Sequence, residues 1–240
     1  MTAQLSVFLC CSCLCWQTGQ DDWRGLASKA QQAEKTGNLQ DARKLLDTAI
    51  KLEPKRAELF SMRGGILFKQ AKIAESLADF DQQIRLKPSD APAHWRRGLT
   101  LYYADKFSEG VAQFVTSDKA EPEDVENAVW HLLCNAKVKG LEPARKELLK
   151  ISQDSRVPMM EVYALFAGRS SVEKVLSAAN ATGVQDKTSS RFYAYLYCGL
   201  FEEMMGNSMK SQEYIRKALE HPIDHYMMDV ARVHVQLRKK

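Results

Sequence analysis

The sequence predicts an all-α fold, a solenoid of about five stacked helical hairpins closed by a C-terminal capping helix. Pro54, Pro88 and Pro122 follow one another at intervals of 34 residues, and Gly64 and Gly98 keep the same interval. A fixed period of roughly 20 to 50 residues is typical of stacked repeats, in which each unit buries its apolar face against its neighbours. The composition, 45% hydrophobic and 27% charged, supplies enough apolar material for a continuous core.

The first 20 residues differ from the rest of the chain, because they carry no charge and contain a short apolar run from Leu5 to Trp16. The run is too short to span a bilayer as a helix, but it has the length of the apolar region of a signal peptide. No basic residue precedes it and no A-x-A cleavage site follows it. We expect a leader that exports the protein to the cell envelope or beyond; the alternative is an apolar tail on a cytoplasmic protein.

Four of the six cysteines lie in this run: Cys10, Cys11, Cys13 and Cys15. Thiolates at this density can bind soft metals, but no second Cys or His cluster completes a zinc-type spacing, so a cysteine-rich apolar leader is the preferred interpretation. Lipidation of Cys10 or Cys11 is a third alternative, although the large residues before Cys10 fit a bacterial lipobox poorly. Cys134 and Cys198 lie in apolar helical patterns and are expected in the core.

Residues 23–54, 57–88 and 91–122 align without gaps. In each second helix a small residue is followed four positions later by a large one; the pairs are Ala42 and Leu46, Ser76 and Phe80, and Gly110 and Phe114. Small residues let two helices approach closely, and the large residue fills the space under the next hairpin. Gly64 and Gly98 each cost about 1 kcal/mol of helix propensity relative to Ala, so their recurrence indicates a packing requirement.

This pattern resembles the tetratricopeptide repeat (TPR). The small, large, glycine and closing-proline positions all match, and only the usual first-helix Trp is replaced, by Leu26, Phe60 and His94. The resemblance implies a right-handed superhelix of hairpins whose first helices line a concave, partner-binding face.

After residue 122 the period fades, but helical patterns continue. We predict a degenerate fourth hairpin (123–139 and 142–151), short helices over 159–167 and from Ser170 or Ser171 to 179, and a loop over 180–190. A fifth hairpin (191–205 and 208–220) and a last helix capped by Asp224 follow, and that helix is expected to cover the apolar edge of the fifth hairpin. The chain therefore divides into a leader (1–20), three regular repeats (21–122) and a degenerate helical part (123–240).

The segments 94–103, 129–132 and 192–197 resemble, in order, segments of the bacterial NlpI-like TPR lipoproteins. This resemblance extends over residues 57–236. It implies an envelope-anchored, often dimeric, all-helical adaptor that docks a periplasmic protease and its substrates, or cell-wall enzymes.

The candidate partner-binding residues lie on the first helices of repeats two and three: Phe68, Lys69, Trp95, Arg96, Leu99, Tyr102 and Tyr103. Aromatic and Arg side chains dominate binding hot spots, which is why they are chosen. The competing interpretation is that individual aromatic residues among them are core between repeats.

The sequence contains no Gly-rich phosphate loop, no G-x-S-x-G, no H-E-x-x-H and no zinc-type Cys pair, so we predict a non-enzymatic protein without cofactor or metal. His221 and His225 do not share a helix face, because Pro222 lies between them. The net charge of +4 gives no electrostatic reason to expect nucleic acid. We therefore predict a scaffold for protein or peptide partners that meets a membrane only through its N-terminus. A homodimer is one alternative for the oligomeric state, which the sequence leaves open. The alternative function is that of a self-associating structural envelope protein.

Overall fold

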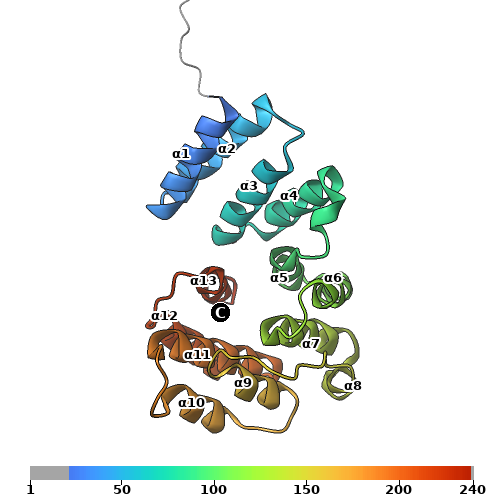
Figure 1. The fold of residues 1–240 in the computed structure, drawn as a ribbon, viewed down its shortest axis with the longest axis vertical. Coiled ribbons are helices and arrows are strands. Elements are labelled where there is room, and N and C mark those ends of the chain that lie inside the picture. Colours follow the sequence, from blue (N-terminus) through green and yellow to red (C-terminus); the bar gives the residue numbers. More distant parts are fainter. Residues whose placement is uncertain (1–21, 239–240) are drawn as a thin grey trace, which may run out of the picture.

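The computed structural model describes residues 22–238, and within that range it is built from α-helices, one short 3₁₀ helix and connecting loops, without strands. The predicted all-α hairpin solenoid is confirmed (Figure 1). The expected leader, with Cys10 and Cys11, lies outside the described residues. No helix between residues 22 and 238 is both long and apolar enough to cross a membrane.

Three regular hairpins form the first half of the solenoid, each packed on the next (Figure 1). Their helices are α1 (Trp23–Lys35) with α2 (Leu39–Leu52), α3 (Ala57–Lys69) with α4 (Ile73–Leu86), and α5 (Trp95–Tyr103) with α6 (Phe107–Ala120). The short 3₁₀ helix η1 (Pro88–Asp90) follows α4 at the repeat-closing proline. These bounds agree with the alignment of the three repeats.

The small-and-large packing predicted from the repeats is present. A Cβ atom added to Gly64 would lie 2.7 Å from Cε1 of Phe80, and one added to Gly98 would lie 2.6 Å from Cζ of Phe114. Both rings are fully buried. The two glycines are therefore required because the ring of the second helix lies directly on the backbone of the first.

The second half is less regular. Its helices are α7 (Val125–Lys139), α8 (Leu141–Lys146), α9 (Met159–Phe166), α10 (Val172–Asn180), α11 (Lys187–Met204), α12 (Ser208–Leu219) and α13 (Tyr226–Leu237). The predicted fifth hairpin is α11 with α12, although α11 begins earlier than expected because Asp186 caps it by accepting from the Ser189 N–H at 3.0 Å. Ser171 caps α10 as predicted. The cap of α13 is His225 rather than Asp224.

The second helix of the fourth hairpin is shorter than predicted, because α8 ends at Lys146 and residues 147–158 are largely non-helical. This 147–158 segment returns to the start of α7, where the backbone N–H groups of Ser152 and Gln153 donate to the Glu123 carboxylate at 2.6 and 3.1 Å. Backbone N–H groups need hydrogen-bond acceptors. Here the Glu123 carboxylate supplies the acceptors that the carbonyl groups of a longer helix would have supplied.

The main core extends from α3 to α13 and includes Trp130, Cys134 and Cys198. Both cysteines are fully buried, as the sequence predicted. A smaller core joins α1, α2 and the facing side of α3.

The last helix, α13, does not only cover the final hairpin. It contacts α12 but also α3, so it lies inside the curve of the solenoid (Figure 1). Besides packing on the fifth hairpin as expected, it therefore has a second role: its buried face, which includes Met227 and Val230, completes the main core.

Candidate functional site

The inner face of the first repeats is partly occupied by α13. The ring of Tyr226 stacks on Phe68 with centroids 5.4 Å apart and meets Trp95 edge-on at 5.2 Å. The Lys69 ammonium lies 2.8 Å from Asp229 of α13 and 2.9 Å from Glu34 of α1. The chain's own last helix thus sits where the sequence led us to expect a partner.

Four of the seven candidate residues are core rather than open surface: Phe68, Leu99, Tyr102 and Tyr103. The Tyr102 hydroxyl donates to Glu203 of α11 at 2.9 Å, and the Tyr103 hydroxyl lies 3.1 Å from His234 Nδ1 of α13. The expectation of an open aromatic groove over these four residues is therefore corrected. The reason is that α11 and α13 pack against the first helices from the far end of the sequence.

The other three candidates are half-buried. Lys69 is held between its two carboxylates, and the Arg96 guanidinium donates to Ser61 Oγ at 2.8 Å while lying over the Phe80 and Tyr226 rings. Trp95 lines an open hollow, together with Leu99 at its base. Partner binding by these residues stays a prediction, with Trp95 the best placed of the seven.

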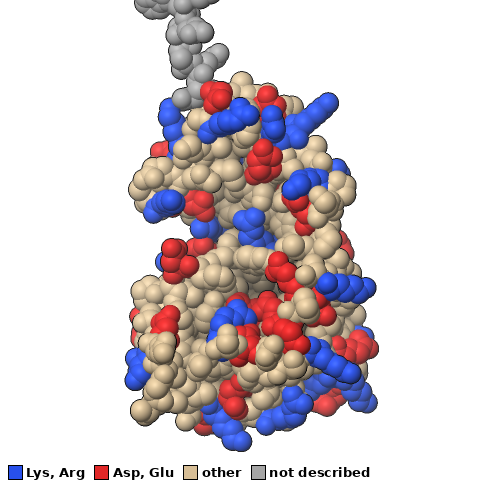
Figure 2. Space-filling view, viewed as in Figure 1, with Lys and Arg blue, Asp and Glu red and all other residues tan. Residues whose placement is uncertain are grey.

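This hollow is the candidate site. It has a volume of about 820 Å³ and lies between α5, α6, α7, the 147–158 segment and the start of α13. Figure 2 shows the molecule hollowed here, with acidic side chains gathered at the edge. Its aromatic wall consists of Trp95, Phe114 and Trp130.

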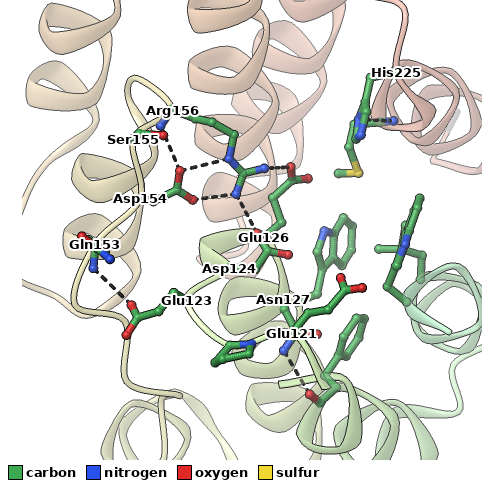
Figure 3. A pocket seen from close by; sticks show the side chains of 16 residues that line it. Glu121, Glu123, Asp124, Glu126, Asn127, Gln153, Asp154, Ser155, Arg156 and His225 are labelled. Atoms are coloured by element: carbon green, nitrogen blue, oxygen red, sulfur yellow. Dashed lines mark hydrogen bonds and ion pairs between the residues drawn. The ribbon is translucent and has the colours of Figure 1, made fainter. Parts of the chain in front are cut away.

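Five carboxylates line the hollow, and Arg156 is the one Lys or Arg among its lining residues; the carboxylates belong to Glu121, Glu123, Asp124, Glu126 and Asp154. The Arg156 guanidinium contacts three of them, Asp124 and Asp154 at 2.6 Å and Glu126 at 2.7 Å (Figure 3). Burial opposes the charge of Arg156, but the hydrogen bonds and charges of these carboxylates outweigh it and raise its pKa. One guanidinium cannot balance all these carboxylates, so the hollow is acidic.

Glu126 is the buried member of the cluster, at 8% exposure. Burial raises its pKa to about 7 even though Arg156 favours the charged form, and the Tyr197 hydroxyl donates to its other oxygen at 2.9 Å. Glu123 behaves oppositely, since hydrogen bonds from Ser152 and the Gln153 backbone lower its pKa. Burial and the charge of Arg156 lower the pKa of His225 and so favour its neutral form.

Two buried polar atoms at the hollow have no hydrogen-bond partner among residues 22–238. Asn127 is 5% exposed; its Nδ2 donates to the Phe114 carbonyl at 3.0 Å, but its Oδ1 accepts nothing (Figure 3). Trp130 is 1% exposed, and its Nε1–H donates to nothing. Buried polar groups are almost always paired with protein or with ordered water, so these two atoms are open to a water or to a polar group of a ligand.

Sequence reasoning missed this acidic site. The signal was visible in the run Glu121-Pro122-Glu123-Asp124 before α7, where the repeat alignment ends. Acidic residues favour a helix N-terminus through its dipole, so the run had an ordinary structural explanation. The ion pairs of this acidic region with Arg156 depend on the path of the 147–158 segment through space, which the sequence does not indicate.

No family profile and no curated protein matches the chain. Among solved structures it is similar to a tetratricopeptide repeat protein from Parabacteroides merdae, with a TM-score of 0.57 and 14% identity over 90% of this chain and 84% of that one. MamA from Desulfovibrio magneticus gives a TM-score of 0.52 and 14% identity over 83% and 94% of the two chains. PilW, a type IV pilus biogenesis factor, gives 0.51 and 17% over 87% and 97%.

Identities this low carry information about the fold alone. The helical hairpins, the glycine-on-ring packing and these likenesses agree, and the described part of the chain has the fold of a TPR-type solenoid.

Proposed function

We propose that this protein is a non-catalytic scaffold that binds a segment of a partner protein in the hollow on the inner face of its solenoid. The observation that supports it is the hollow itself, which is open, has an aromatic wall at Trp95 and contains two unpaired buried polar atoms. Stacked repeats create extended concave binding surfaces, and here the hollow beside α13 is an open part of that surface.

Selection of peptides from a random library on the full chain tests the proposal. Selected peptides should share a motif, bind the wild-type chain and lose binding to Trp95→Ala. Tyr195→Ala is the matched control, because Tyr195 is also half-buried but stacks on Tyr214 and His221, away from the hollow. The circular dichroism spectrum should be unchanged in both variants.

Two results would contradict the proposal. One is a library that yields no common motif, and the other is a motif whose binding ignores the Trp95 change. Size-exclusion chromatography addresses the alternative function. A tight dimer or an open polymer that excludes the selected peptides would favour self-association over partner binding.

We further infer that the protein acts in the cell envelope, as the NlpI-like resemblance and the uncharged N-terminal run suggest. Mass spectrometry of the native N-terminus tests this. A cleaved chain, or one that carries a lipid at Cys10 or Cys11, supports export. An intact, unmodified N-terminus in a cytoplasmic fraction counts against it.

A further inference from the structure

We propose that the hollow recognises a positively charged side chain, so that the bound segment is a basic peptide that places a Lys or Arg there. This inference rests on the proposed scaffold function and adds the chemistry of the partner.

The charge of the site is the first argument. Five carboxylates surround the hollow, while its one guanidinium, Arg156, already contacts three of them. The whole chain has a net charge of +4, so the negative potential is local to this site. A cleft lined by one sign of charge concentrates ligands of the opposite sign and repels acidic ones.

The unpaired polar atoms are the second, independent argument. Asn127 Oδ1 is an acceptor without a donor, and an ammonium or guanidinium supplies N–H donors. Trp130 Nε1–H is a donor without an acceptor, and a peptide carbonyl oxygen supplies one. A basic peptide therefore offers a partner to both atoms.

A bare metal ion would match the negative charge, but it cannot accept a hydrogen bond from the indole N–H of Trp130. Within residues 22–238, no group of three or more His, Cys, Asp or Glu side chains is arranged to hold an ion. A cation carried on a peptide fits the acidic residues without requiring such a group.

The wall of the hollow is the third argument. Trp95 is half-buried and lines the hollow, so its ring offers apolar surface next to the carboxylates. Lys and Arg side chains combine an apolar stem with a charged head, and aromatic faces attract the head within about 6 Å. An uncharged apolar side chain would contact the aromatic wall but would leave the carboxylates without a countercharge.

Glu121 offers a clean variant for the test. It is exposed at the end of α6 and has no hydrogen-bond or ion-pair partner among the described residues, so its replacement disturbs no contact of the fold. Glu220 is the matched control, an exposed glutamate at the end of α12 that does not line the hollow. Lysine at either position changes the charge of the chain by the same amount.

The experiment measures fluorescence anisotropy of a labelled peptide of alternating Lys and Ala with the full-length chain. Binding should weaken several-fold when salt rises from about 50 to about 500 mM, because screening shortens the range of the attraction. Glu121→Lys should weaken binding by at least about tenfold, and Glu220→Lys should leave it within about twofold of wild type. Peptides with Glu or norleucine in place of Lys should bind at least about tenfold more weakly.

Three results would overturn the inference: equal losses in the two charge-reversal variants, which indicate non-specific attraction; equal binding of the norleucine peptide; or no binding of the Lys peptide. The scaffold proposal fails separately. If library selection yields a Trp95-dependent motif without Lys or Arg, the scaffold function stands and only the basic-partner inference is lost.

Discussion

In the regular repeats a glycine of the first helix lies directly against a phenylalanine ring of the second helix. Phe80 is fully buried against Gly64, and Phe114 is buried in the same way against Gly98. The same pair thus recurs one repeat further on, which explains why the 34-residue period is so exact in this part of the chain. The ring fills the space that the missing side chain leaves.

We expect Phe80→Ala to lower the free energy of unfolding by about 3 to 5 kcal/mol, because a large core ring is removed. Gly64→Ala should also destabilise the wild type, since the added methyl would lie 2.7 Å from the Phe80 ring. In the Phe80→Ala background the same glycine change should cost less or even stabilise, as the clash is gone and Ala favours helix. Urea unfolding of the four proteins measures this, and additive effects would contradict direct contact.

Glu126 makes the stability of the protein depend on pH. Its pKa is raised from 4.5 to about 7, so the folded state holds a proton that the unfolded state has released. This contribution is complete below pH 4.5 and is lost as the pH rises through 7. Between pH 5 and 8 the loss should amount to about 2 to 3 kcal/mol.

Glu126→Gln should remove that pH dependence, because Gln keeps the shape of the protonated acid and can still accept from Arg156. Urea unfolding at pH 5 and pH 8 measures the slope. Glu121→Gln is the control, an exposed carboxylate of the same hollow, and should leave the slope as in the wild type. An unchanged slope in Glu126→Gln would contradict the assignment of the pH dependence to Glu126.

Among the elements, α13 decides which part of the inner face is accessible, and Tyr226 is its main contact there. Its ring packs between Phe68 and Trp95, while its hydroxyl has no hydrogen-bond partner within residues 22–238. Tyr226→Phe should therefore be neutral or stabilise by up to about 1 kcal/mol, because an unsatisfied buried polar group is removed.

Tyr226→Ala should instead cost about 3 kcal/mol or more, through the lost ring contacts. Thermal melts of the two variants separate the roles of the ring and the hydroxyl. A large loss of stability in Tyr226→Phe would reveal a hydrogen bond to an ordered water.

The elements also show what the sequence could and could not predict. Repeats 23–122 were predictable because each small-and-large pair is local and recurs at a fixed interval. The early end of α8 was not, because it depends on Glu123 accepting from residues 29 and 30 positions further on. The position of α13 depends on contacts such as Tyr103 with His234, which are 131 residues apart. Consequently the sequence singled out Trp95, which lines the hollow, whereas the carboxylates and Asn127 were not identified.

At the scale of the whole molecule, α13 changes how an array of repeats behaves. Stacked repeats normally contact only their neighbours, so their stability is a sum of local terms. Here Lys69 of α3 is ion-paired with Asp229, and Tyr103 of α5 meets His234, so the last helix joins the first repeats to the final hairpin. We therefore expect the described chain to unfold as one cooperative unit.

Deletion of residues 221–240 should break this coupling. Amide hydrogen exchange should then become at least about tenfold faster in α3 and α5, because both lose the helix that covers their inner face. Since the deletion uncovers Phe68 and Tyr103, the double variant Lys69→Ala with Asp229→Ala is a milder test that should loosen α3 in the same direction. If exchange in α3 and α5 stays at its wild-type rate in both proteins, α13 lies on the inner face without stabilising it, and the first repeats are stable on their own.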